Sequence, residues 1–144
     1  MSLRYLLDTN TLSAVIAIKP NRGVIKRLEQ HGTECAIASI VWNELVYGCE
    51  RLAKGKRKAE LDAFLRDVVI KSFPVLAYDE RAARWHGLER ARMEREGLLR
   101  PYVDGQIAAI ARVNELTIVT ANVRDFAGFK ELAVEDWTKP RARA

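Results

Sequence analysis

Cysteine and histidine are scarce in this sequence, which limits the kinds of site that it can build. Only Cys35 and Cys49 are present among 144 residues, too few for a disulfide framework. Together with His31 and His86 they show no paired spacing of the kind that holds zinc. We therefore expect two reduced thiols in the core and no zinc site.

Long apolar runs and linkers are absent as well. No segment approaches the roughly 20 apolar residues of a membrane-spanning helix, and Met1–Asn10 has no apolar stretch of the signal-peptide type. We expect a cytoplasmic protein without membrane contact. Because repeats and Gly/Ser linkers are also missing, we expect one domain over residues 1–138 and a disordered basic tail over residues 139–144.

Charge of one sign is only slightly in excess. Lys and Arg outnumber Asp and Glu by 24 to 19, a net charge of +5. Such a balance is compatible with a polyanionic partner but indicates one only weakly. Three of the basic residues lie in the tail (Lys139, Arg141 and Arg143), so the excess without the tail is 5 − 3 = +2.

Short apolar runs rich in branched residues alternate with longer segments of helical period. The pattern predicts strands at residues 4–7, 35–38, 73–77, 117–120 and about 132–134, and helices at 11–17, 21–31, 39–54, 59–69, 79–96 and after Pro101. Strands separated by helices of this length pair in parallel, with helices on both faces of the sheet. The predicted class is therefore α/β, with sites beyond the carboxyl ends of the strands.

Most acidic residues lie among Lys and Arg on helical faces. Glu89, Glu94 and Glu96 are examples, and we expect them to be solvated. Two other polar residues precede predicted helices, and we expect Ser39 and Asp79 to cap them.

Four acidic residues do not fit a solvated helical face. Asp8 and Asp125 follow the first and fourth predicted strands, whereas Glu44 and Asp104 lie near the starts of helices, on the apolar side. Each has an ordinary structural explanation when taken alone. A turn or cap explains Asp8, a single ion pair explains Glu44, the helix dipole explains Asp104, and a surface turn explains Asp125 equally with Asn122.

Taken together, the four acids occupy the places where an α/β fold gathers side chains into one crevice. Carboxylates held together repel one another, and either proton uptake or a bound cation relieves the repulsion. A hard divalent ion, Mg²⁺ or Mn²⁺, suits oxygen ligands. Such an ion polarises a phosphoryl oxygen and activates water, which is the chemistry of phosphodiester hydrolysis without a covalent enzyme intermediate.

These residues also carry a family resemblance. Four segments in order resemble the PIN domain: 6–13 (LLDTNTLS), 39–45 (SIVWNEL), 101–109 (PYVDGQIAA) and 119–126 (VTANVRDF). Their spacing, the chain length and the closing 134–137 (VEDW) resemble the VapC and FitB toxins of bacterial type II toxin–antitoxin modules. The resemblance implies a three-layer α/β/α sandwich with a mainly parallel central sheet.

The resemblance further implies a Mg²⁺-dependent endoribonuclease that a cognate antitoxin holds inactive. Carried over by position, Asp8 and Asp104 are the expected metal ligands, and Glu44 and Asp125 complete the acidic site. Two residues, Asp125 and Asn122, are candidates for the fourth position of the site. Hydrogen-bonding groups around the site are expected to be Thr9, Asn10, Thr120 and Asn122.

The resemblance also implies partners. They are RNA as substrate, an antitoxin seated near the helices of residues 40–69, operator DNA only through the antitoxin, and a second copy of the chain in a homodimer. Basic residues that are candidates for guiding RNA through its phosphates are Arg51, Lys54, Lys56, Arg57, Lys58, Arg90, Arg92 and Arg100. Two alternatives stay open at this point: a catalytically silent module that acts in operator binding, and a metal-dependent DNA nuclease.

Overall fold

A five-stranded parallel sheet forms the centre of the molecule. A computed structural model describes residues 2–140, so the part of the predicted tail at residues 141–144 lies outside it. The strands run in the order β3-β2-β1-β4-β5, and every neighbouring pair is parallel. Their bounds are β1 (Tyr5–Leu7), β2 (Cys35–Ala38), β3 (Val75–Leu76), β4 (Thr117–Val119) and β5 (Val134–Glu135).

The central strands are apolar because both of their faces are covered. All residues of β1 and β2 are buried, as expected for parallel strands between two helical layers. The edge strand β3 is shorter than the predicted 73–77. Pro74 directly precedes β3. Because proline lacks an N–H group, it contributes only its carbonyl, which accepts from the amide of Ile37 at 3.0 Å.

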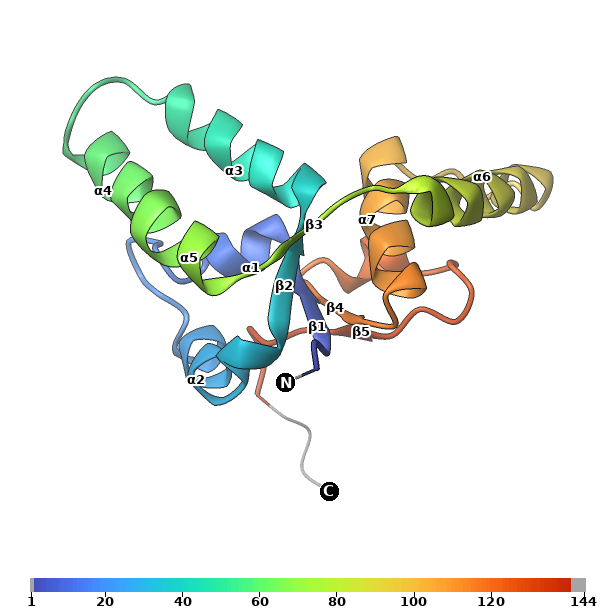
Figure 1. Cartoon of the computed structure of the whole chain (residues 1–144), viewed down its shortest axis with the longest axis horizontal. Helices are drawn as coiled ribbons and strands as arrows, with labels where there is room; N and C mark the ends of the chain where they lie inside the picture. Colours follow the sequence, from blue (N-terminus) through green and yellow to red (C-terminus); the bar gives the residue numbers. More distant parts are fainter. Residues whose placement is uncertain (1, 141–144) are drawn as a thin grey trace.

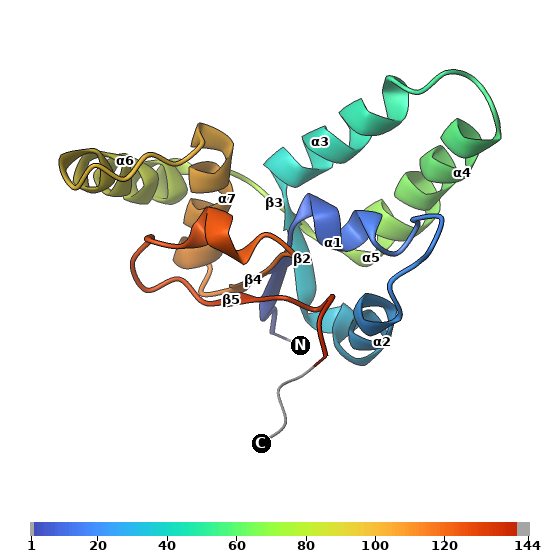
Figure 2. The same ribbon diagram turned by 180° about the vertical axis from the view of Figure 1, so that it is seen from behind.

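Helices lie on both faces of the sheet, which confirms the predicted class and its three layers. The order of the strands explains this arrangement, because the chain steps from β1 to β2 to β3 and then returns to the other side of β1. Figures 1 and 2 show α6 and α7 on one side of the sheet and the remaining helices on the other. The helices are α1 (Thr9–Ser13), α2 (Arg22–His31), α3 (Ser39–Glu50), α4 (Lys56–Phe64), α5 (Ile70–Ser72), α6 (Glu80–Arg95) and α7 (Tyr102–Val113), with short helical turns η1 (Gly32–Glu34), η2 (Leu65–Val69) and η3 (Val123–Phe126).

Three of the predicted helix starts are wrong. The helix α4 begins at Lys56, three residues before the predicted start at residue 59. Ser39 is the first residue of α3 rather than its cap; the cap is Ala38, and no side chain caps this helix. The helix α1 begins two residues earlier than predicted, because Asp8 caps it by accepting from the amide of Thr9. Asp79 caps α6 as predicted, accepting from the amide of Ala82 at 2.9 Å.

The prediction for Glu89 is also wrong, whereas those for Glu94 and Glu96 are confirmed. Glu89 is buried, and its carboxylate accepts from Arg92 Nε at 2.8 Å and Nη2 at 2.7 Å. It also accepts from the backbone amide of Lys130 at 3.1 Å. A partner on a distant loop thus makes burial of this carboxylate tolerable.

Both cysteines are free and buried, as predicted. Burial raises the pKa of the Cys35 thiol to about 12, so this thiol stays protonated at neutral pH. No helix within residues 2–140 is long and apolar enough to cross a membrane.

The packing of α6 against α7 depends on a glycine. The ring of His86 on α6 sits against Gly105 on α7, and a Cβ atom at Gly105 would lie 2.1 Å from His86 Nε2. His86 is itself fully buried, and its Nδ1 hydrogen-bonds the hydroxyl of Tyr78 at 2.9 Å. The neighbour of Gly105 in sequence is Asp104, so this contact fixes the first turn of α7.

We expect Gly105→Ala to destabilise the fold by about 1–3 kcal/mol, because the added methyl group forces His86 out of its place. The matched control is Gly87→Ala on α6, where a Cβ atom meets nothing within 4 Å. There the gain in helix propensity stabilises the fold by about 0.5–1 kcal/mol. Urea unfolding of both variants checks the pair, and equal free energies of unfolding for the two would contradict the packing argument.

Candidate active site

The candidate site lies where the order of the strands reverses. The connection after β1 runs over one face of the sheet, and the connection before its neighbour β4 runs over the other, which leaves a crevice beyond their carboxyl ends. Asp8 and Thr120 are the first residues after these two strands. The amide of Asp8 donates to the carbonyl of Val119 at 2.9 Å, so the pairing of the strands continues into the site.

Hydrogen bonds hold the Asp8 carboxylate in one orientation. Its Oδ2 accepts from the hydroxyl of Thr120 at 2.9 Å and from Asn10 Nδ2 at 3.3 Å. Its Oδ1 accepts from the amide of Thr9 at 2.9 Å. Burial, together with the charges of nearby acids, raises the pKa of Asp8 above its usual value. The hydrogen-bond donors favour the charged form and lower the pKa, but by less than this combined effect.

Thr120 and Asn10 link the Asp8 carboxylate to the loop after β4. Thr120 is fully buried, and its hydroxyl accepts from Asn10 Nδ2 at 3.1 Å and from the amide of Asn122 at 3.0 Å. Asn10 Oδ1 accepts from the amide of Ala121 at 2.9 Å. Asn122 therefore joins this network through its backbone, whereas its side chain is exposed.

Glu44 reaches the site from α3. The hydroxyl of Thr9 donates to its Oε2 at 2.6 Å, a short bond of the kind that charged acceptors form. The bond joins α1 to α3 and leaves the Oε1 atom of Glu44 without a partner within residues 2–140. Glu44 lies on the apolar face of its helix, as predicted, and this face meets the loop after β1, where Thr9 supplies a hydrogen-bond donor.

Asp104 lies in the first turn of α7, which begins at the same edge of the sheet (Figure 1). Burial is the main cause that raises the pKa of Asp104 to about 6, followed by the charges of Asp125, Asp8 and Glu44. The charge of Arg100 acts in the opposite direction. The fold has thus brought four carboxylates from four separate segments close enough to repel one another.

Asp125 is the most exposed of the four. It lies in the short turn η3. Of the nearby charges, that of Asp125 has the largest effect in raising the pKa of Asp104. Phe126, the next residue, is buried and anchors the turn. Of the two candidates for the fourth position, Asp125 is the one whose charge acts on the other carboxylates, since Asn122 carries none.

One hydroxyl that sequence reasoning missed supports this arrangement. Thr11 is buried and donates to the carbonyl of Val119 at 2.9 Å, the same carbonyl that accepts from the amide of Asp8. The signal was present in the sequence, because Thr11 follows the two predicted site residues Thr9 and Asn10 directly.

The donor chemistry of the four carboxylates fits a hard divalent cation. All offer oxygen, and Arg100 is the one positive charge that lowers the pKa of Asp104. Within residues 2–140, the potential ligands whose donor atoms converge to within 4.8 Å are Cys49, Glu50 and Asp62, at the end of α3 and on α4. The four carboxylates do not converge to this extent within residues 2–140, and Mg²⁺ commonly completes its shell with water.

Comparison with known proteins identifies the relatives of this chain. The model of the PIN domain family matches residues 5–133. The chain is 36% identical over 137 residues to the tRNA(fMet)-specific endonuclease VapC of Salmonella typhimurium, covering 94% of this chain and 98% of that protein. It is 32% identical over 136 residues to Ribonuclease VapC2 of Haemophilus influenzae, covering 94% and 98%.

Solved structures agree with the sequence relatives. One is FitAB bound to the IR36 DNA fragment, with a TM-score of 0.88 and 25% identity, covering 97% of this chain and 99% of that one. Another is DNA-bound VapBC from Salmonella typhimurium, with a TM-score of 0.82 and 32% identity, covering 94% and 98%.

Removal of one carboxylate should stabilise the metal-free protein. The folded pKa of Asp104 (about 6) exceeds the usual value near 3.8, so the folded state binds more protons and loses stability as pH rises from about 4 to about 6. In a chelator at pH 8, Asp104→Asn should therefore raise the free energy of unfolding by about 1–2 kcal/mol, a value reduced for solvent screening.

Urea unfolding at pH 8 and pH 4 checks this expectation. The difference between Asp104→Asn and the unsubstituted protein should be much smaller at pH 4, where Asp104 is protonated in the folded state and partly protonated in the unfolded chain. The control is Glu29→Gln, exposed on α2, for which we expect no such pH-dependent difference. A destabilised Asp104→Asn variant at pH 8 would contradict the repulsion that we describe.

Proposed function

The chain belongs to the PIN domain family and, within it, to the VapC group, and on that premise we propose that it is a metal-dependent endoribonuclease and the toxin of a VapBC-type module. The observation that carries the proposal is the set of Asp8, Glu44, Asp104 and Asp125, whose charges act on one another beyond β1 and β4. We propose that it acts in the cytoplasm, where its proposed RNA substrate is found.

We propose Mg²⁺ as the cofactor, with Mn²⁺ as a substitute, held by Asp8 and Asp104 and, through water, by Glu44 and Asp125. When bound, such an ion polarises the scissile phosphate and lowers the pKa of a water molecule. Thr120 and Asn10 orient Asp8 by their hydrogen bonds to Oδ2, so the carboxylate is in place before any ligand arrives.

Glu44 is the residue that we propose to accept a proton from the attacking water. Thr9 occupies its Oε2, which fixes the side chain and leaves Oε1 free for that task. Neither histidine is available, because His86 is buried between α6 and α7 and His31 pairs with Glu34 at 3.0 Å. Water is therefore the proposed nucleophile, and no covalent intermediate with the protein forms.

The proposed partners follow from the relatives. The two solved neighbours named above are a FitAB complex and a VapBC complex, both bound to DNA. We propose that this chain likewise binds a cognate antitoxin, contacts operator DNA only through it, and forms a homodimer. Support for a protein-binding face comes from the hairpin of α3 and α4, which projects from the sheet (Figure 1) with Val46 and Tyr47 exposed.

One of the basic residues predicted to guide RNA is excluded. Arg92 is only 14% exposed, and its guanidinium is bound to Glu89, to Glu96 and to the carbonyl of Gly128. Arg90 and Arg100 are exposed near the start of α7 and remain candidates.

Asp8→Asn and Asp104→Asn should each lower the rate of RNA cleavage at least about a hundredfold, because each removes a ligand charge next to the reacting phosphate. Sequencing of RNA ends after induction, together with cleavage of purified RNA in Mg²⁺, measures the effect. The matched control is Asp67→Asn, an exposed acid that pairs with Arg66, which should cleave normally.

Full cleavage in excess chelator, or full activity of both variants, would refute the proposed function. Intact growth inhibition by both variants would point instead to the silent operator-binding module. Cleavage of DNA but not of RNA would favour the DNA nuclease.

Thr120→Val should lower activity about ten- to a hundredfold, because the isosteric side chain cannot donate to Asp8 Oδ2. Thr120→Ser keeps the hydroxyl and should retain most of the activity. Circular dichroism verifies that both variants fold, and equal activities for Val and Ser at this position would show that the hydroxyl does not matter.

A further inference from the structure

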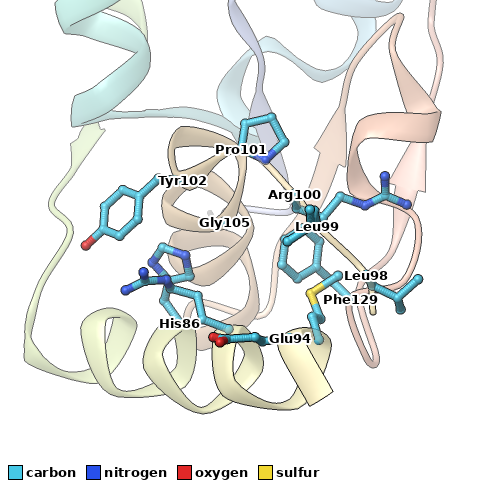
Figure 3. A pocket seen from close by; sticks show the side chains of 11 residues that line it. His86, Glu94, Leu98, Leu99, Arg100, Pro101, Tyr102, Gly105 and Phe129 are labelled. Carbon is cyan, nitrogen blue, oxygen red and sulfur yellow. The ribbon is translucent and has the colours of Figure 1, made fainter. Parts of the chain in front are cut away.

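A cavity of about 270 Å³ opens beside the proposed active site, between α6 and the start of α7. Its walls come from α6 (His86, Arg90), from the loop that joins α6 to α7 (Leu98, Leu99, Arg100) and from Tyr102 (Figure 3). Gly105 also lines it, one residue after Asp104. The cavity therefore adjoins the helix turn that carries a proposed metal ligand.

The cavity is lined by two arginines and one carboxylate, Glu94, together with exposed apolar surface. Within residues 2–140, neither Arg90 nor Arg100 forms an ion pair with a carboxylate. Leu99 is 86% exposed, so its apolar surface is accessible to a ligand. Basic groups beside apolar and aromatic side chains are typical of surfaces that bind single-stranded nucleic acid.

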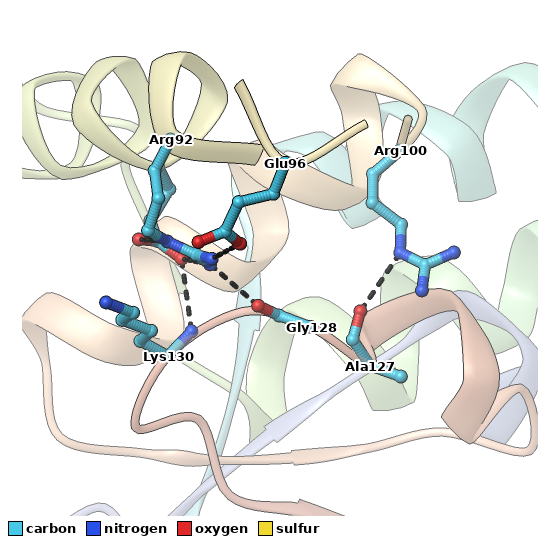
Figure 4. Close-up of polar contacts among 7 residues, drawn as sticks. Arg92, Glu96, Arg100, Ala127, Gly128 and Lys130 are labelled. Carbon is cyan, nitrogen blue, oxygen red and sulfur yellow. Dashed lines mark hydrogen bonds and ion pairs between the residues drawn. The ribbon is translucent and has the colours of Figure 1, made fainter. Parts of the chain in front are cut away.

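Two hydrogen bonds to the loop at residues 128–130 hold one wall of this cavity in place. Arg92 on α6 bonds the carbonyl of Gly128, and Glu89 accepts from the amide of Lys130 (Figure 4). The loop between them carries Phe129, which is buried and lines the cavity. The cavity is thus formed before a ligand binds, which lowers the entropic cost of binding.

Arg100 connects the cavity to the carboxylates. Its Nε donates to the carbonyl of Ala127 at 3.0 Å (Figure 4), which fixes the guanidinium and leaves both Nη atoms free within residues 2–140. Its charge acts on Asp104. A guanidinium presents paired donors that match a phosphate, so Arg100 is placed to hold a phosphate next to the one that is cleaved.

We propose that this cavity binds one unpaired nucleotide of the RNA substrate, with its phosphate on Arg100 and its base against Leu98 and Leu99. The inference rests on the proposed function. A volume of about 270 Å³ lies just below the usual range of small-molecule pockets, roughly 300–1,000 Å³, and so suits one nucleotide rather than a base pair. Unpaired bases are also the ones that side chains can stack against.

Binding of fluorescein-labelled single-stranded RNA tests the proposal, measured by anisotropy in the full-length Asp8→Asn background with Mg²⁺ present. Arg100→Met should raise the Kd about tenfold and reduce the slope of log Kd against log salt by about 0.7, the value for one lost phosphate contact. The matched control is Arg95→Met, which removes the same charge outside the cavity and should change the Kd less than about twofold.

Leu99→Ser supplies a second arm that puts little strain on the fold, because this side chain is exposed. It should raise the Kd for single-stranded RNA about fivefold without changing the salt slope, and should leave the Kd for duplex RNA unchanged. Equal Kd values for the Arg100, Leu99 and Arg95 variants would overturn the proposal. A Leu99→Ser variant with altered sedimentation but unchanged Kd would overturn it too, and would assign this face to a second copy of the chain.

Failure of the inference and failure of the proposed function are distinguishable. If the unsubstituted protein cleaves RNA and the Arg100 and Leu99 variants both bind and cleave like the Arg95 variant, the inference fails alone. If the unsubstituted protein does not cleave RNA but the expected pattern of Kd values is observed, the proposed function fails and the nucleotide site stands.

Discussion

The parallel pairing of β1 with β4 is the constraint on which the rest of the site depends. It sets Asp8 beside Thr120, although 112 residues separate them in sequence, and continues as the bond from the amide of Asp8 to the carbonyl of Val119. Because α3 directly follows the parallel strand β2 and α7 runs back toward the start of β4, both helices begin at this edge. Glu44 and Asp104 enter the same crevice as a consequence.

The site is electrostatically unfavourable without a cation, and the fold tolerates it through hydrogen bonds. Three donors act on Asp8, yet its pKa remains raised. Burial, followed by the nearby carboxylates, raises the pKa of Asp104 to about 6, and within residues 2–140 no hydrogen-bond donor reaches its carboxylate. Destabilised charges of this kind concentrate at functional sites. The same arrangement that costs stability in the metal-free protein would give the proposed divalent ion its affinity, so stability and the proposed function oppose each other at these residues.

The sequence pattern predicted most of the fold, because buried parallel strands and capped helices have strong local signatures. It also singled out the four acids, since a carboxylate at a strand end or on an apolar helix face is locally unfavourable. It failed for Glu89, whose partner amide at Lys130 lies 41 residues away and leaves no trace in helical periodicity. The contact between His86 and Gly105 was invisible for the same reason, as it joins two helices through a missing side chain.

Calorimetric titration with Mn²⁺ tests the central claim most directly, namely that the four carboxylates form a cation site. The unsubstituted protein should bind Mn²⁺, and a variant that combines Asp8→Asn with Asp104→Asn should lose this binding while remaining folded. Absence of binding by the unsubstituted protein, or equal binding by the double variant, would contradict the account.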